Sequence, residues 1–227
     1  MASELRVLST LALKGAVERL ADKYQATTET RLDADFAPTV GLLKRLRERE
    51  KADVLILTRE GLDELVATGA VAPPSRIDLA RSHVGIAVKA VRPHPDISTE
   101  GALCTALLAA RSVAYSKIGA SGIYFAGLIQ RLGIAAEINA RATITAGFTA
   151  ERLISGEADL AIQQLSELKQ VAGVEIVGPI PLGLQAPAVF TAGRMVSSEK
   201  AAQADALLKF LASPEVAPVL RDSGLEP

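Results

Sequence analysis

Tryptophan is absent from the 227 residues, and aromatic residues make up only 4% of them. Sites that stack sugars or single-stranded nucleic acid rely on aromatic faces, so this scarcity argues against both kinds of site. No excess charge of either sign is present, since 25 Lys and Arg residues stand against 26 Asp and Glu residues. We therefore expect no nucleic-acid partner and a small, polar ligand.

Cysteine and histidine are also scarce, because Cys104 is the single cysteine and His83 and His94 are the two histidines. One thiol cannot form an internal disulfide or a thiolate metal cluster, and two histidines do not make a His-rich site. Cys104 lies in an apolar segment and is expected to be a buried structural thiol. The sequence predicts neither a metal site nor a cofactor.

Long apolar stretches are lacking too, since none reaches the roughly 18 residues that a membrane span needs. Residues 1–8 lack the basic and apolar regions of a signal peptide, so the sequence as written predicts a cytoplasmic protein without membrane insertion. A leader removed from the front of the chain would instead place the protein in the periplasm. A transporter or a sensor would then be the expected protein partner.

What the sequence does contain is an alternation of short β-like segments and amphipathic helical patterns, which is typical of β-α-β units and parallel sheets. The length suits two modest lobes. We predict a two-lobed α/β fold in which each lobe is a mostly parallel sheet flanked by helices. Lobe one comprises residues 1–82 and 190–227, and lobe two comprises residues 83–189. Two hinge crossovers connect them, and the ligand cleft is expected between them.

The individual elements follow from apolar periodicities of 2 and 3.6 residues. Residues 71–78 contain prolines and are expected to form a connector, and Ser197 and Ser198 form the expected N-cap of a late helix. Strands are predicted at residues 5–9, 28–33, 52–57, 83–91, 112–116, 142–145, 158–163, 173–179 and 188–192. Helices are predicted at residues 13–24, 42–46, 60–67, 99–110, 121–132, 149–155, 197–212 and 214–220.

Four turns lead from a predicted strand into a helix, at residues 9–14, 36–41, 116–124 and 145–151. In open parallel sheets, ligands bind beyond the carboxyl ends of the strands, where the next helices present free N–H groups and the positive ends of their dipoles. Two turns belong to each predicted lobe. Lobe closure would therefore aim four helix starts at one enclosed ligand, which suits an anion.

Candidate ligand-binding residues lie in or beside these turns, although helix capping explains several of the hydroxyl residues equally well. Two glycines flank Ser121 and permit close approach of the backbone. Arg81 is placed either to clamp a carboxylate with two hydrogen bonds or to form an interlobe salt bridge. Gln163 and Gln164 end a strand whose faces alternate, so one of them is expected in the cleft, and we favour Gln164. The predicted set is Ser9, Thr10, Lys14, Thr39, Arg81, Ser121, Gly122 and Gln164.

Eight short segments occur in order along nearly the whole chain: VLST at 7–10, FAPT at 36–39, ADVLIL at 52–57, DLARS at 78–82, PDIST at 95–99, ASGIY at 120–124, GEAD at 156–159 and FLASPE at 210–215. Together they resemble the type II periplasmic-binding-protein fold in its molybdate-binding-protein-like family. This resemblance implies a solute-binding protein of the kind that serves transporters, with molybdate or tungstate as one candidate ligand. The chain departs from that family at Ala12 and Gln164, where a serine and a tyrosine are implied. The resemblance also implies that the backbone amides of Ser121 and of Gly147 or a neighbour bind the ligand, which adds Gly147 to the predicted set.

The segments AYS at 114–116 and QQLSEL at 163–168 resemble a sub-branch similar to aconitate isomerase, which moves a proton and a double bond in a tricarboxylate. On that resemblance, Arg81 and Lys14 are carboxylate partners. An isomerase also needs a base within reach of the α-carbon, and His83, Tyr115 and Glu167 are the candidates.

The sequence therefore predicts a protein that binds a small carboxylate or oxyanion. The first alternative is an isomerase or tautomerase of a di- or tricarboxylate, and the second is a molybdate- or tungstate-binding protein. An effector or interaction domain with the same fold also stays open.

Overall fold

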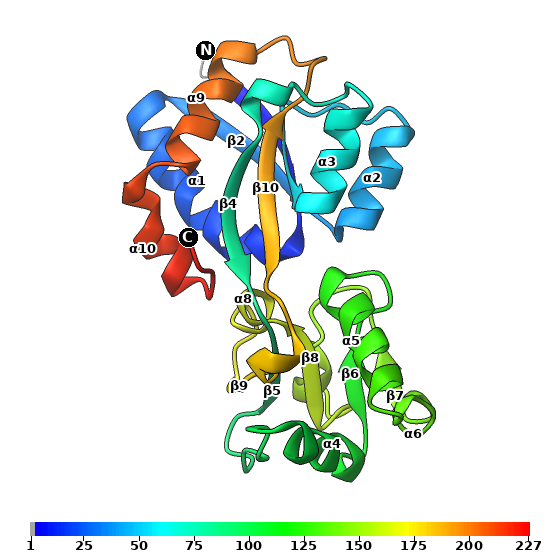
Figure 1. Cartoon of the computed structure of the whole chain (residues 1–227). Coiled ribbons are helices and arrows are strands. Elements are labelled where there is room, and N and C mark those ends of the chain that lie inside the picture. Colours follow the sequence, from blue (N-terminus) through cyan, green and yellow to red (C-terminus); the bar gives the residue numbers. More distant parts are fainter. Residues whose placement is uncertain (1–2) are drawn as a thin grey trace. The chain divides into compact units, whose positions relative to one another are not determined.

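The structure, a computed structural model, describes residues 3–227 and divides into two units (Figure 1). Unit one extends to Arg81 and resumes from Ala188 to Pro227, and unit two is Ser82–Pro187. The chain therefore passes from one unit to the other twice, and unit one is assembled from two separate stretches of sequence.

Unit one is built on a five-stranded sheet with the order β2-β1-β3-β10-β4. β1 pairs in parallel with β2 and β3, whereas β10 pairs antiparallel with β3. The strands are β1 (Ser3–Ser9), β2 (Thr30–Phe36), β3 (Val54–Thr58), β4 (Ile77–Ser82) and β10 (Ala188–Arg194). The helices are α1 (Lys14–Thr28), α2 (Thr39–Arg47), α3 (Arg59–Ala67), α9 (Ala201–Leu211) and α10 (Ala217–Asp222), with 3-10 turns at Leu11–Leu13, Pro73–Ser75 and Pro214–Val216.

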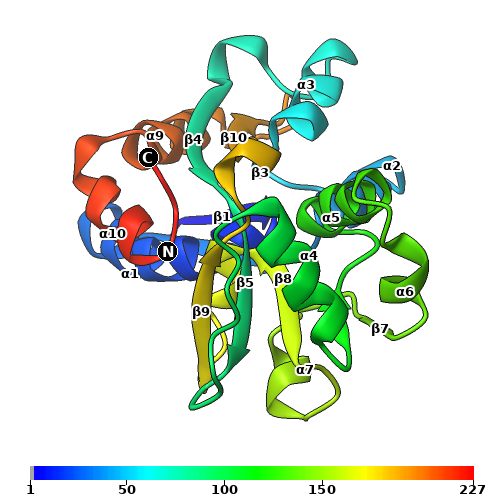
Figure 2. The same ribbon diagram turned by 60° about the horizontal axis from the view of Figure 1, so that its bottom comes forward.

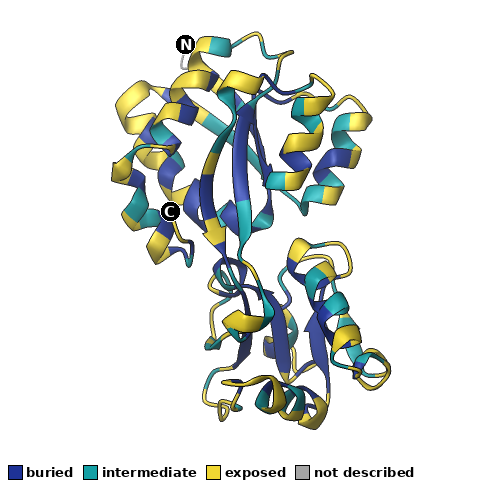
Figure 3. Cartoon of the chain, viewed as in Figure 1, coloured by how far each residue is buried: buried dark blue, intermediate teal, exposed yellow. Residues whose placement is uncertain are grey.

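Both faces of this sheet are covered by helices. Alternate side chains of a strand point to opposite faces, and β1 illustrates this because Val7 and Leu8 belong to different apolar clusters. The cluster that contains Val7 includes side chains of α1, α9 and α10, and the cluster that contains Leu8 includes side chains of α2 and α3. The central strands β1, β3 and β10 are accordingly mainly buried (Figure 3).

Unit two is built on a second five-stranded sheet, with the order β7-β6-β8-β5-β9. β6 pairs in parallel with β7 and β8, and β5 runs antiparallel to both β8 and β9, so four of the five strands share one direction. Figure 2 shows β9, β5 and β8 side by side. The strands are β5 (Val84–Lys89), β6 (Val113–Tyr115), β7 (Ala142–Ile144), β8 (Leu160–Gln164) and β9 (Val174–Pro179). The helices are α4 (Glu100–Ala109), α5 (Ala120–Arg131), α6 (Ala135–Asn139), α7 (Glu151–Ile154) and α8 (Leu165–Leu168), with a 3-10 turn at Leu182–Leu184.

The two faces of this second sheet differ in the size of their side chains. One face packs large side chains against α4, α5 and α6, and Phe125 of α5 is fully buried there. The other face presents the small side chains of Ala87, Ala114 and Ala161 to the short helices α7 and α8. Cys104 on α4 is partly buried, where the sequence predicted a buried thiol, and it packs against the first of these clusters.

The predicted strand at residues 28–33 begins too early. Helix α1 continues to Thr28, because the hydroxyls of Thr27 and Thr28 both donate to the Tyr24 carbonyl, at 3.1 Å and 2.8 Å. Glu29 then ends the helix with a left-handed φ of 57°. Thr28 and Thr30 gave residues 28–33 a strand-like composition, yet local hydrogen bonds hold Thr28 in the last turn of the helix.

Two further predictions about unit one are wrong. The end of the predicted connector at residues 71–78 is the start of β4, which runs over Ile77–Ser82. Neither Ser197 nor Ser198 is the N-cap of α9, which begins at Ala201 with Lys200 as its N-cap. Ser198 instead accepts a hydrogen bond from the Lys200 N–H at 3.1 Å and donates to the Asp53 carboxylate at 2.6 Å.

Candidate functional site

Four of the predicted ligand-binding residues lie at the carboxyl edge of the sheet in unit one. Ser9 ends β1 and is in register with Phe36 of β2 and Ile56 of β3. The Ser9 carbonyl accepts from the Ala37 N–H at 3.1 Å, and the Thr10 N–H donates to the Ile56 carbonyl at 2.8 Å. These bonds hold the ends of three parallel strands together. The edge is therefore a rigid platform on which Ser9, Thr10, Lys14 and Thr39 are grouped.

Two features of this edge leave hydrogen-bonding groups free. The Thr10 residue is 6% exposed, and its hydroxyl makes no hydrogen bond to any part of the chain that the structure describes. Helix α2 starts at Thr39 without a side-chain cap, and the Thr39 hydroxyl accepts from the Thr58 N–H at 3.2 Å. Uncapped N–H groups at a helix start favour an anion.

Positive charge at this edge comes from Lys14 and from Arg59, which the sequence analysis did not single out. Lys14 pairs with Glu18, and its ammonium lies 5.1 Å from the centre of the Phe36 ring. Arg59 directly follows β3 and pairs with Asp78 at 2.6 Å. Its Nε is buried and has no partner among the described residues. The position of Arg59 immediately after a buried strand was the signal in the sequence that would have found it.

Arg81 is the penultimate residue of β4 and the last residue of unit one before the chain enters unit two. Its backbone N–H donates to the Glu226 carbonyl at 2.7 Å, and its carbonyl accepts from the Glu226 N–H at 2.8 Å. The residue as a whole is exposed. The backbone of Arg81 is thus fixed by the end of the chain, while its side chain is in contact with solvent.

In unit two, the first turn of α5 is built around Ser116, Gly119, Ser121 and Gly122. The Ser116 hydroxyl accepts from the N–H groups of Ile118 and Gly119, at 3.2 Å and 3.0 Å. A Cβ added at Gly122 would lie 1.5 Å from the Ser116 carbonyl oxygen. Gly122 is therefore required by the close approach of the protein's own backbone, a reason that differs from the predicted approach of a ligand.

The hydrogen-bonding groups in this turn that lack partners among the described residues belong to Ala120 and Ser121. Helix α5 has no side-chain cap, and the N–H groups of Ala120 and Ser121 have no acceptor within residues 3–227. Ser121 is only 2% exposed, and over the same residues its hydroxyl forms no hydrogen bond. A hydroxyl and two N–H groups without partners at one helix start form a suitable cradle for an oxyanion or a carboxylate.

Gln163 holds the loop that contains Gly147. Its amide accepts from the Thr149 N–H at 2.8 Å and from the Thr149 hydroxyl at 3.0 Å, and it donates to the Gly147 carbonyl at 3.2 Å. Thr149 is fully buried, and the Gly147 N–H donates to the Thr145 hydroxyl at 3.4 Å. The polar side chains of this loop therefore bind one another.

Replacing Gln163 by methionine is expected to lower the free energy of unfolding by about 1–3 kcal/mol, because the Thr149 N–H and hydroxyl would stay buried without this partner. Urea unfolding followed by circular dichroism measures the change. The control is Gln130→Met on the exposed surface of α5. Equal stability of the two variants would contradict the role given to Gln163.

Gln164 caps α8 through a reciprocal pair of hydrogen bonds with Glu167. The Gln164 side chain accepts from the Glu167 N–H, and the Gln164 N–H donates to the Glu167 carboxylate at 3.2 Å. In the amide orientation that satisfies all neighbours, Gln164 also donates to the carbonyls of Ser82 and His83, at 3.0 Å and 3.2 Å. Gln164 is 2% exposed and links the end of β8 to the segment that enters unit two.

Among the three candidate bases, Glu167 has the most unusual environment. Burial raises the pKa of its carboxyl from 4.5 to about 7, although hydrogen bonds from the Gln164 N–H and the Gln163 side chain favour the ionised form. The neighbouring Ser166 hydroxyl is buried and has no partner in the described chain. A carboxyl with a pKa near 7 can both accept and donate a proton at neutral pH.

The other two candidate bases have different surroundings. Tyr115 is 1% exposed in the core of unit two, where its ring packs edge-on against Phe125 and its hydroxyl donates to Asn139 at 2.5 Å. Burial raises the pKa of Tyr115. His83 is partly buried between β4 and β5, and its carbonyl accepts from the Leu165 N–H at 2.9 Å.

Within the described residues, no three His, Cys, Asp or Glu side chains are grouped so that they could hold a metal ion. The same part of the chain contains no helix that is long and apolar enough to span a membrane. Each unit therefore has its own candidate groups. In unit one these are hydroxyls, backbone N–H groups and cations at the carboxyl edge of the sheet, and in unit two they are a hydroxyl and backbone N–H groups at the start of α5.

Comparison with known proteins gives two matches at the level of sequence. Residues 5–226 match the family of bacterial extracellular solute-binding proteins. The chain is also 38% identical over 230 residues to an aconitate isomerase of a Pseudomonas species, and the match covers 98% of this chain and 87% of the relative.

Solved structures with the same fold bind different ligands. The periplasmic molybdate-binding protein of Azotobacter vinelandii superposes with a TM-score of 0.83 at 19% identity, covering 98% of this chain and 99% of that one. A tungstate-binding protein from Desulfovibrio alaskensis superposes with a TM-score of 0.68 at 17% identity, covering 97% and 94%. Identities this low establish the fold alone, and the predicted fold of periplasmic binding proteins is confirmed.

Proposed function

Because the chain belongs to the family of bacterial extracellular solute-binding proteins, we propose that it binds a small anion with several carboxylates, and that aconitate is the lead candidate. The observation that carries this proposal is the first turn of α5, where the Ser121 hydroxyl and two N–H groups lack partners among the described residues. Thr10 and the uncapped start of α2 supply similar groups in unit one. Each is suited to a negatively charged oxygen.

Several cations support a carboxylate over a neutral solute. Arg59 and Lys14 lie at the carboxyl edge of unit one, and Arg81 is the penultimate residue of β4 in the same sheet. A guanidinium matches the planar geometry of a carboxylate and can bind it through two hydrogen bonds. Ala12 and Gln164 stand where the molybdate-binding family is expected to have hydroxyl ligands, which favours a carboxylate over molybdate or tungstate.

A thermal-shift screen tests the ligand class. A ligand at 100 times its dissociation constant adds about 2.7 kcal/mol to the free energy of unfolding. We expect citrate, cis-aconitate or trans-aconitate to raise the melting temperature, and molybdate, tungstate, sulfate and phosphate to leave it unchanged. A shift with the oxyanions alone would contradict the carboxylate proposal and support the molybdate-type alternative.

Variants at the unpaired hydroxyls test the site. Ser121→Ala and Thr10→Ala are each expected to weaken binding of the tricarboxylate about 10- to 100-fold, since a hydrogen bond to a charged group contributes about 1.5–3 kcal/mol. Isothermal titration calorimetry measures the affinity. The control is Thr105→Ala, which removes an exposed hydroxyl that donates to the Gly101 carbonyl on α4. Unchanged affinity in both test variants would remove this site from the proposal.

Isomerisation is the second candidate function, favoured by the relative that is 38% identical. In that reaction a base removes a proton from the CH2 carbon of aconitate. The proton then returns to the former vinyl carbon, so the double bond moves and the cis and trans forms interconvert. Glu167, with a pKa of about 7, is the candidate proton carrier. Proton NMR in heavy water would detect both conversion and solvent exchange. Binding without conversion would identify a receptor.

The family description also suggests a place outside the inner membrane and a transporter or sensor as partner. We propose this partner for the case in which the tricarboxylate binds but is not converted. A receptor of this kind delivers its ligand unchanged, whereas an isomerase needs no protein partner for its reaction.

A further inference from the structure

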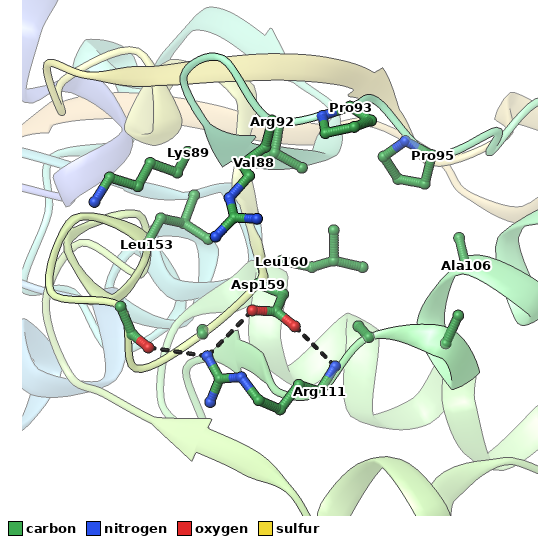
Figure 4. A pocket seen from close by; sticks show the side chains of 14 residues that line it. Val88, Lys89, Arg92, Pro93, Pro95, Ala106, Arg111, Leu153, Asp159 and Leu160 are labelled. Atoms are coloured by element: carbon green, nitrogen blue, oxygen red, sulfur yellow. Dashed lines mark hydrogen bonds and ion pairs between the residues drawn. The ribbon is translucent and has the colours of Figure 1, made fainter.

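A cavity lies in unit two, at the edge of the sheet opposite the carboxyl ends of β6 and β8 (Figure 4). Its lining includes Arg111, just before β6, and Leu160, which begins β8. The cavity has a volume of about 390 Å³, within the range of about 300–1,000 Å³ that is usual for small-molecule sites. The candidate site described above uses the other ends of these strands.

Most of the lining is apolar. Pro93 and Pro95 come from the loop after β5, Ala106 from α4, Leu153 from α7 and Leu160 from β8. Figure 4 shows these side chains around one open space. A ligand with an apolar body gains most from these walls, because it removes their apolar surface from water.

The charged groups at the cavity leave an excess of positive charge. Asp159 is occupied by Arg111, since one carboxylate oxygen pairs with the guanidinium at 3.1 Å and the other accepts from the Arg111 N–H at 2.9 Å. Lys89 donates to the Ile154 carbonyl at 3.4 Å. Arg92 makes no ion pair or side-chain hydrogen bond within the described chain. Three cations thus face one carboxylate that is already neutralised.

An unusual turn fixes the backbone at Arg92, which is an exposed residue. Val91 has a φ of 65°, a left-handed conformation that is costly for a β-branched residue, and it is 94% exposed. The Arg92 N–H donates to the Lys89 carbonyl at 3.1 Å. In Figure 4 the Arg92 guanidinium points into the cavity, toward the side that carries Leu153 and Asp159. The unpaired charge is therefore directed at the apolar space.

We propose that this cavity is a second binding site, which takes a small carboxylate with an apolar chain or ring, and that Arg92 binds the carboxylate. The apolar walls accommodate the body of the ligand. The guanidinium supplies the opposite charge and up to two parallel hydrogen bonds. This site is separate from the one assigned to the tricarboxylate and does not depend on that assignment.

Titration of the full chain with octanoate, followed by amide NMR, tests the proposal. Octanoate is expected to shift the amides of Ala106, Arg111 and Leu160, and 1-octanol, which has the same chain without the charge, is expected to bind more weakly. Arg92→Ala should weaken octanoate binding at least about tenfold, because the charge-assisted bonds are lost. Arg131→Ala, at an exposed arginine of α5 outside the cavity, is the matched control.

A second variant tests the cavity without changing its charge. Ala109 lines the cavity and is exposed, so Ala109→Phe is expected to fill the space and abolish octanoate binding while the fold is retained. Equal affinities for octanoate and 1-octanol, or an unchanged affinity in Arg92→Ala, would overturn the proposal. Arg92→Ala is expected to bind citrate or aconitate as the parent chain does. Loss of octanoate binding can therefore be told apart from loss of tricarboxylate binding.

Discussion

Replacing Gly122 by alanine is expected to lower the free energy of unfolding by at least about 3 kcal/mol. The added Cβ would lie 1.5 Å from the Ser116 carbonyl oxygen, 2.5 Å from its carbonyl carbon and 3.0 Å from its nitrogen. All three atoms belong to the backbone, so no rotamer change can relieve the overlap. The first turn of α5 would have to move away from the end of β6.

Gly127 on the same helix is the matched control. A Cβ at Gly127 would meet only the Arg131 guanidinium, at 3.6 Å. Gly127→Ala is therefore expected to raise stability by about 0.5–1 kcal/mol, since alanine favours the helix. Urea unfolding monitored by circular dichroism compares both variants with the parent chain. Two variants of similar stability would mean that the approach of Ser116 does not require a glycine.

The unfolding free energy of Glu167→Gln, relative to that of the parent chain, is expected to rise by about 3 kcal/mol between pH 4 and pH 8. Burial raises the pKa of Glu167 to about 7 in the folded chain, against an ordinary value of 4.5. The contribution of this carboxyl to stability is therefore fully present below pH 4.5. It is lost as the pH rises through 7, because a charge must then stay buried.

The measurement is the difference in unfolding free energy between variant and parent chain at intervals of pH. Glu157→Gln serves as the control because the pKa of Glu157 is shifted in the opposite direction. Hydrogen bonds from Ser155 and Arg152 lower the pKa of Glu157, so that carboxylate stabilises the fold above its ordinary pKa and the contribution is lost in acid. A difference between Glu167→Gln and the parent chain that stays constant from pH 4 to pH 8 would refute the expected ionisation.

The fold was largely predictable because most elements carry their own periodicity. The apolar segment at residues 52–57 and the helical spacing that follows residue 13 are local signals, and the structure places β3 and α1 there. β4 was missed because Asp78 and Arg81 interrupt its apolar pattern, and its partner β10 begins more than a hundred residues later. Ser198 failed as an N-cap because the distant Asp53 binds its hydroxyl.

The candidate site was predictable in position but less so in the role of each residue. The rule about carboxyl ends of strands identified Ser9 and Thr10, at the end of β1, and Ser121, in the first turn of the helix that follows β6. The rule that strand faces alternate favoured Gln164 over Gln163, yet both amides are buried with hydrogen-bond partners. Partners of this kind come from loops and crossovers that no local pattern predicts. A ligand cleft between the lobes, and hinge closure around it, stay predictions.

The place of β10 in the sheet of unit one has a consequence for synthesis on the ribosome. β10 lies between β3 and β4, although it follows all of unit two in the chain. While residues 82–187 emerge, β4 has no neighbouring strand to pair with, and the sheet of unit one stays open at β3. All of unit two has been synthesised before β10 emerges, and domains generally fold as units when their chain is available. Unit two, the middle of the chain, is therefore expected to fold first, and unit one, which needs both ends of the chain, is expected to fold last.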